Sequence, residues 1–122
     1  MPVSAVADTP GCPAGTELFT EYRLFFGRSR GSIEVVSDAA WQTFLAREVT
    51  PRFPDGLTVL DARGQWRDSI GLTVRERTKL VIILAKPGGE GIRLTDEITE
   101  AYKRAFGQES VLRAISAACV SF

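Results

Sequence analysis

The sequence predicts an α+β domain in which a four-stranded antiparallel sheet carries two helices on one face. Four segments have strand composition and two have helical spacing, in the order β-α-β-β-α-β. That order is the split βαβ, ferredoxin-like arrangement, and right-handed crossovers place both helices on the same face. At 122 residues the chain is one domain. We expect a flexible N-terminal arm over residues 1–17 and a single domain over 18–122.

The first strand and the first helix are predicted from aromatic content and capping chemistry. Residues 18–28 are rich in aromatic side chains and form the first strand, followed by a loop at 29–32. Ser37 is a good helix N-cap, and Trp41 and Phe44 follow at helical spacing. The helix should end before Pro51, since the residue that precedes a proline disfavours the helical conformation.

Two strands joined by a tight turn follow. We expect strands at 57–66 and 72–85, with Gly64 marking a bulge or twist in the first of them. The residues Leu80–Ala85 are apolar throughout, as in an interior strand that is covered on both sides.

The last part of the chain predicts a helix and a strand. We expect a flexible glycine-rich loop at 86–91 and a second helix capped by Thr95. Gly107 should end that helix, because glycine commonly follows the last turn. The fourth strand is expected at 110–122.

The face of the sheet without helices should carry apolar side chains, because the first, third and fourth strands are apolar on both sides. An exposed face of this kind is normally an interface or a ligand site. We expect a homodimer in which two sheets pack face to face, with a dimeric α/β barrel as one form of it. The alternative is that the N-terminal arm covers this face.

Composition excludes several classes of function. Fifteen basic residues balance fifteen acidic ones, which does not fit a general nucleic-acid binder. No apolar run approaches the ~20 residues of a transmembrane helix. The chain has no histidine, so catalytic triads built on histidine and most zinc or haem sites are excluded. We expect no metal and no cofactor.

The two cysteines, Cys12 and Cys119, lie near opposite ends of the chain. They form either a disulfide that ties the arm to the last strand or a buried Cys119 thiol and an exposed Cys12 thiol. We expect the disulfide, which would indicate an oxidising compartment. The first 15 residues do not read as a signal peptide. We therefore expect a periplasmic or secreted protein if a leader was removed, and a cytoplasmic one otherwise.

The predicted hairpin carries the strongest candidate site. Alternation along a strand places Arg63, Gln65 and Arg67 on one face, and Arg75 and Arg77 share a face of the partner strand. Arginine binds carboxylates and phosphates through its planar fork. These residues therefore predict an anion site. Trp66 would be its apolar or stacking wall.

Two further points belong to this candidate site. The same pattern also fits a solvated hairpin with cross-strand ion pairs to neighbouring carboxylates, among them Glu76. Arg52, beside the Pro-Asp-Gly turn at 54–56, is added to the candidate ligand-binding residues because turn chemistry does not explain it.

Six segments resemble one bacterial family, the domain of unknown function family 3574. They are FFGRS (25–29), VSDAAW (36–41), VTPRFPDGLTVLDARGQWRD (49–68), VRERTKLVIIL (74–84), YKRAFGQESVLR (102–113) and CVSF (119–122). The resemblance covers the chain from about Leu18 to its C-terminus. It implies export, and it supports the pairing of Cys12 with Cys119, but it implies no reaction.

We therefore expect a small domain that binds an anionic small molecule or a partner protein through the arginine-rich hairpin. The alternative is a small cofactor-free enzyme of the dimeric α/β-barrel type, with a pocket of arginines and carboxylates. The sequence leaves open whether the protein is an enzyme.

Overall fold

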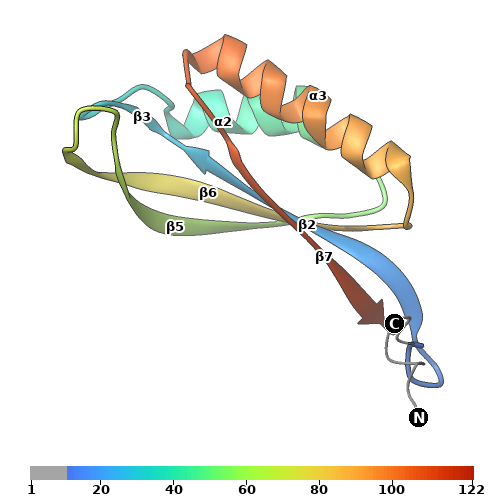
Figure 1. Ribbon diagram of the computed structural model, residues 1–122. Coiled ribbons are helices and arrows are strands. Elements are labelled where there is room, and N and C mark those ends of the chain that lie inside the picture. The colour runs from blue at the N-terminus through green and yellow to red at the C-terminus, as the bar shows by residue number, and fades with distance from the viewer. Residues whose placement is uncertain (1–10) are drawn as a thin grey trace.

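The computed structural model describes residues 11–122. Its elements are β2 (Glu17–Gly27), β3 (Ser29–Arg30), β4 (Ile33–Glu34), α2 (Asp38–Phe44), the π-helical turn η1 (Leu45–Val49), β5 (Thr58–Arg67), β6 (Thr73–Ala85), α3 (Gly89–Phe106) and β7 (Leu112–Val120). The long strands form one antiparallel sheet in the order β5-β6-β2-β7. Both helices cover one face of it (Figure 1). The predicted α+β fold with a four-stranded antiparallel sheet and two helices is confirmed.

The core lies between the sheet and the helices and is largely aromatic. Phe26 of β2 is fully buried and its ring centroid lies 4.7 Å from that of Tyr102 and 5.2 Å from that of Trp41. Phe44 joins the same cluster from α2. Such ring pairs contribute about 0.5–1.5 kcal/mol each beyond the burial of their area. This cluster fixes both helices against the centre of the sheet.

The first helix begins as the sequence predicts. The backbone N–H of Ala40 donates to Ser37 Oγ at 3.1 Å, so Ser37 is the N-cap. The helix continues as the π-helical turn η1, in which Thr50 N–H donates to the carbonyl of Leu45 at 2.9 Å. It ends before Pro51.

The second helix begins earlier than predicted. The glycine-rich stretch expected to be a flexible loop forms the first turn of α3 from Gly89, and Thr95 is a buried mid-helix residue rather than its cap. The Thr95 hydroxyl donates to the carbonyl of Gly91 at 2.8 Å. A Cβ at Gly91 would clash with the Tyr22 hydroxyl oxygen, so this glycine lets α3 approach the sheet closely.

Two other details differ from the prediction. The expected loop at 29–32 is part of a short hairpin, β3–β4, that reaches Glu34. Gly64 marks no bulge, because the pairing of β5 with β6 runs unbroken through it. A Cβ there would lie 2.8 Å from the Thr78 hydroxyl, which explains the glycine by close packing.

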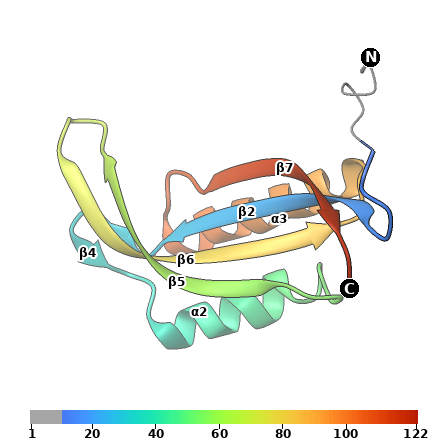
Figure 2. The same ribbon diagram turned by 90° about the horizontal axis from the view of Figure 1, so that it is seen from below.

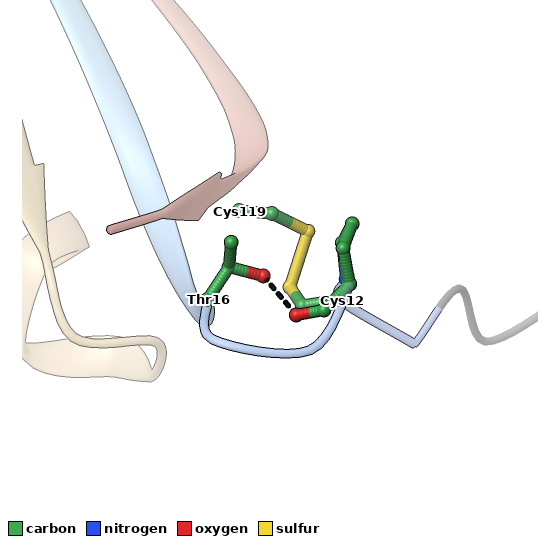
Figure 3. Close-up of a disulfide and its surroundings, with 4 residues drawn as sticks. Cys12, Thr16 and Cys119 are labelled. Atoms are coloured by element: carbon green, nitrogen blue, oxygen red, sulfur yellow. Dashed lines mark hydrogen bonds between the residues drawn. A yellow bond between two sulfur atoms is a disulfide. The ribbon is translucent and has the colours of Figure 1, made fainter.

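Cys12 and Cys119 form a disulfide, with 5.4 Å between their Cα atoms and 107 residues of separation (Figure 3). The expected disulfide is confirmed. In the chain-entropy model a loop of this length contributes about 4–5 kcal/mol to stability. The bond ties the segment before β2 to β7, at the end of the sheet far from the β5–β6 turn (Figure 1).

Two predictions concern the N-terminal residues. The predicted division into an arm over 1–17 and a domain over 18–122 stays a prediction. Residues 1–10 of that arm lie outside the described residues. The alternative that the arm covers the open side of the sheet depends mostly on those residues. Over residues 11–122 no helix has the length and apolar character needed to span a membrane.

Candidate functional site

The β5–β6 hairpin extends beyond the rest of the sheet. β2 pairs only with residues Thr78 to Ala85 of β6. β5 pairs with residues Thr73 to Ile82 of β6, so the β5–β6 pairing continues past the end of β2. Its end curls away from the plane of the other strands (Figure 2). The turn is fixed by Asp68, whose Oδ1 accepts hydrogen bonds from the backbone N–H groups of Ile70 at 3.0 Å and Leu72 at 2.9 Å.

The strand register places most of the predicted site residues on one face of this hairpin. Arg63 lies directly opposite Arg77, and Gln65 lies opposite Arg75. Alternation puts these four side chains on the face that continues the helix-covered side of the sheet. Arg67 has the same parity but lies at the last pair before the turn. Trp66 has the opposite parity.

A groove of about 470 Å³ runs along the arginine-bearing face. One wall is the hairpin, and the other is the segment of β3 and β4, which contributes Ser29, Ser32 and Glu34. Its other lining residues are Arg63, Gly64, Gln65, Arg75, Glu76 and Arg77. We call this the arginine groove. A second hollow of about 410 Å³ shares Arg63 and Arg77 with it and adds Asp38, Asp61 and Ala62.

A bidentate ion pair holds the two walls of the groove together. Arg77 Nε donates to Glu34 Oε1 at 2.8 Å and Arg77 Nη2 to Glu34 Oε2 at 2.7 Å. These hydrogen bonds lower the pKa of Glu34 and raise that of Arg77. The positive charge of Arg77 is therefore balanced within the protein.

Some of the other charged side chains around the groove are paired within the protein, and two arginines are not. Asp61 accepts a hydrogen bond from Lys79, which lowers the pKa of Asp61. Asp38 pairs at 2.8 Å with the buried Arg28, whose Nε also donates to the carbonyl of Val36. Among residues 11–122, Arg63 and Arg75 form no salt bridge, whereas three other cations nearby each have a carboxylate.

Glu76 anchors the hairpin to the end of β2. Its Oε1 accepts from the backbone N–H of Ser29 at 2.8 Å, and its Oε2 accepts from the indole N–H of Trp66 at 2.6 Å. A Cβ on Gly27 would lie 2.6 Å from Glu76 Oε2. Trp66 thus supports the groove from the opposite face instead of forming its wall.

Arg52 lies elsewhere in the molecule. It donates to Glu97 of α3 at 3.1 Å and to Glu48 of η1 at 3.0 Å, and these hydrogen bonds raise its pKa. It is not among the residues that line the groove. Its partners explain its position, because they join the end of the first helix to the second.

Reasoning on the sequence missed Glu34 as a contributor to the groove. Glu34 closes one wall from a strand of two residues, and Arg28 holds the chain that leads to it. The only local signal was the Gly27-Arg28 pair at the end of a strand. Within the described part of the chain, no three histidine, cysteine or carboxylate residues are grouped as a metal site would need.

Comparisons with known proteins identify a family and a fold. A family model described as "Protein of unknown function (DUF3574)" matches residues 21–122, and the chain belongs to that family. Among curated proteins nothing matches. The structure is similar to that of a phage SAM lyase in complex with S-methyl-5'-thioadenosine, with a TM-score of 0.67, 15% identity, and coverage of 92% of this chain and 94% of that one.

The phage SAM lyase in its apo state is also similar, with a TM-score of 0.63, 15% identity, and coverage of 89% and 92%. At this level of identity the similarity shows the fold alone. It extends over almost the whole of both chains.

Proposed function

We propose that this member of the DUF3574 family binds a small anionic molecule in the arginine groove. One observation carries the proposal: Arg63 stands directly opposite Arg77 on the hairpin, and no carboxylate among residues 11–122 pairs with Arg63. Glu34 balances the charge of Arg77, so the charge of Arg63 is the one left for a ligand. An anion bound between hairpin and wall would pair with it.

The chemistry of the lining fits such a ligand. Arg63, Arg75 and Arg77 contribute three positive charges and Glu34 and Glu76 two negative ones, which leaves a net charge of +1. Glu34 already occupies the fork of Arg77, so the excess charge belongs to Arg63 and Arg75. A guanidinium fork binds a carboxylate or phosphate with two parallel hydrogen bonds. The serine hydroxyls and Gln65 supply further donors.

The ligand class is therefore a compact molecule with at least one carboxylate or phosphate group. A volume of about 470 Å³ lies in the lower part of the range for small-molecule sites, roughly 300–1,000 Å³. An acidic segment of a partner protein would use the same arginines. It would then compete with small anions for binding.

Calorimetric titration with two probes, pyrophosphate and citrate, tests the proposal. We expect at least one of them to bind, and Arg63→Gln to weaken that binding at least about tenfold, which is 1.4 kcal/mol. Arg104→Gln is the matched control, because Arg104 is exposed on α3 and outside the groove. Binding that survives Arg63→Gln unchanged, or that Arg104→Gln weakens equally, would show that the groove is not the site.

A second candidate function is catalysis in the same groove. Glu76, whose carboxylate accepts hydrogen bonds from Ser29 and Trp66, is among the residues that line the groove with Arg75 and Arg77. Such a set of arginines and a carboxylate is what a small cofactor-free enzyme could use. The similar fold of the phage SAM lyase makes S-adenosylmethionine the first substrate to test. Glu76→Gln keeps the shape of the side chain and removes its charge.

Chromatography after incubation with S-adenosylmethionine tests this candidate. Methylthioadenosine should form faster than in a blank with heat-denatured protein, and Glu76→Gln should remove the excess. A rate equal to that of the blank would exclude this reaction and leave the anion-binding proposal standing.

The disulfide supports a proposal on location as well. Disulfides persist in oxidising compartments such as the periplasm or the exterior of the cell. Thiol alkylation in intact cells followed by mass measurement tests it. If Cys12 and Cys119 were both alkylated without prior reduction, an oxidising compartment would be excluded.

A further inference from the structure

The face of the sheet opposite the helices, here called the open face, points to an interaction beyond the arginine groove. In Figure 2 the strands are seen from this side, and no described helix lies in front of them. We infer that the open face binds a second copy of this chain, and that the two sheets pack face to face in a dimer.

On the open face, a row of apolar side chains crosses all four strands beside the charged residues Glu21 and Arg23 of β2. The strand register assigns to it Phe25, Leu60, Leu80, Ile82, Leu84 and Leu112. Leu60 is 43% exposed, Leu84 42% and Leu112 64%. Contiguous apolar patches of this kind are uncommon on monomeric proteins and mark interaction surfaces.

The flat part of the open face is large enough for a small interface. Its four strands have 9 to 13 residues. Without the end of the β5–β6 hairpin, which curls away from the other strands, they cover roughly 500 Å² at a rise of about 3.3 Å per residue and a spacing of about 4.8 Å between strands. A standard interface buries about 800 Å² on each partner, so a second sheet on this face would give an interface at the small end of the range.

The charges on the open face identify a second copy as the occupant. Glu21 and Arg23 are alternate residues of the central strand β2, so they point to the same side, and they pair at 3.3 Å. A two-fold interface brings the same patch from both subunits together. Glu21 of each copy can therefore face Arg23 of the other copy, and Arg23 can face Glu21.

This charge pair also selects the orientation of the two copies. A two-fold axis in the interface plane and across the strands places Glu21 of one copy over Arg23 of the other. An axis along the strands would place Glu21 over Glu21 and Arg23 over Arg23, which like-charge repulsion disfavours. The two β2 strands should therefore run antiparallel across the interface, with the sheets about 10 Å apart.

Light scattering coupled to size-exclusion chromatography tests the inference on the full chain. We expect a mass of twice the 13.3 kDa of one chain. Arg23→Glu should raise the dissociation constant at least about tenfold, since it places like charges opposite each other. The double exchange Glu21→Arg with Arg23→Glu restores the opposite charges and should restore the dimer.

Two further variants complete the test. Leu84→Glu places a second negative charge directly opposite Glu21 on the open face and should give monomers, while Arg47→Glu, exposed at the end of the first helix, should leave the dimer unchanged. Circular dichroism checks that each variant is folded. A wild-type mass of one chain at all concentrations would overturn the inference. So would a higher oligomer, or a dimer that survives both Arg23→Glu and Leu84→Glu.

Discussion

The two halves of strand β6 differ in what surrounds them, although they are one continuous strand. The half from Leu80 to Ala85 lies beneath the helices, and its inward side chains Val81 and Ile83 are fully buried. The half from Thr73 to Lys79 extends mostly past the end of β2 and lines the arginine groove. Three of its charged side chains, those of Glu76, Arg77 and Lys79, meet partners on the short β3–β4 hairpin and on β5.

The difference shows that a single strand can carry both the core and the candidate site. Burial of an aliphatic side chain contributes about 1.5–3 kcal/mol, whereas an exposed ion pair contributes about 0–1 kcal/mol. Stability should therefore depend on the apolar half. Ligand recognition should depend on the polar half, where the cost of an altered side chain is small.

The largest effect is expected in the apolar half. Ile83→Ala leaves a cavity between the sheet and the helices and should lower the free energy of unfolding by about 2–5 kcal/mol. Arg75→Ala, the matched change in the polar half, should alter it by no more than about 0.5 kcal/mol. Urea denaturation measures both. Equal losses for the two variants would contradict the separation of the two halves.

An intermediate loss of stability is expected from a substitution where the two halves of β6 meet. Gly27→Ala would place a methyl group against the Glu76 carboxylate and displace it from Trp66 and Ser29. The loss of hydrogen bonds to a charged group should cost about 1–2 kcal/mol. The indole of Trp66 should become more accessible to fluorescence quenchers, while the buried indole of Trp41 should not.

Gly89→Ala is the control for that variant. It adds the same methyl group at the start of α3, where nothing lies within 4 Å. It should leave quenching as in the wild type and should not lower stability, because alanine is favoured over glycine at a compatible helical position. Unchanged quenching in Gly27→Ala would mean that Glu76 does not hold Trp66 in solution.

The smallest effect on stability is expected when the ion pairs of the polar half are protonated at low pH. Hydrogen bonds from Arg77 and Lys79 lower the pKa values of Glu34 and Asp61 in the folded protein. Such a group stabilises the fold above its unfolded-state pKa, and that contribution is lost as pH falls through the lowered folded-state pKa.

The difference in stability between the wild type and Arg77→Gln should therefore be largest above about pH 5 and shrink on acidification below about pH 4. Chemical denaturation at a series of pH values measures it. A difference that stays constant or grows in acid would show that the Arg77–Glu34 pair contributes nothing through its charge.

Much of the fold could be predicted because its signals are local. Ser37 caps its helix through a hydroxyl three residues from the N–H that it binds, and Gly107 ends α3 in the left-handed conformation with φ of 62°. Strand alternation alone placed Arg63 and Gln65 on one face. The expectation that Trp66 forms a wall of the same site did not follow that alternation. Element order then gave the sheet, since right-handed connections leave few alternatives.

The errors in the prediction arise where distant segments meet. Gly89 and Gly91 lie in a stretch with the composition of a loop, but both are part of helix α3. Gly91 packs there against Tyr22 of β2. Tertiary packing overrides local propensity there. Arg52 likewise has its partner Glu97 45 residues away along the chain, and no spacing rule connects the two.

By itself, the sequence determined the α+β class, the order of the long strands and helices, the caps at Ser37 and Gly107 and the set of arginines on the hairpin, because each follows from patterns within a few residues. Only the tertiary structure decided that Arg63 faces Arg77, that Glu34 takes the fork of Arg77, and that Arg63 is left without a carboxylate among the described residues. Register and long-range ion pairs depend on how the whole chain packs. The candidate site is therefore a property of the fold more than of any motif.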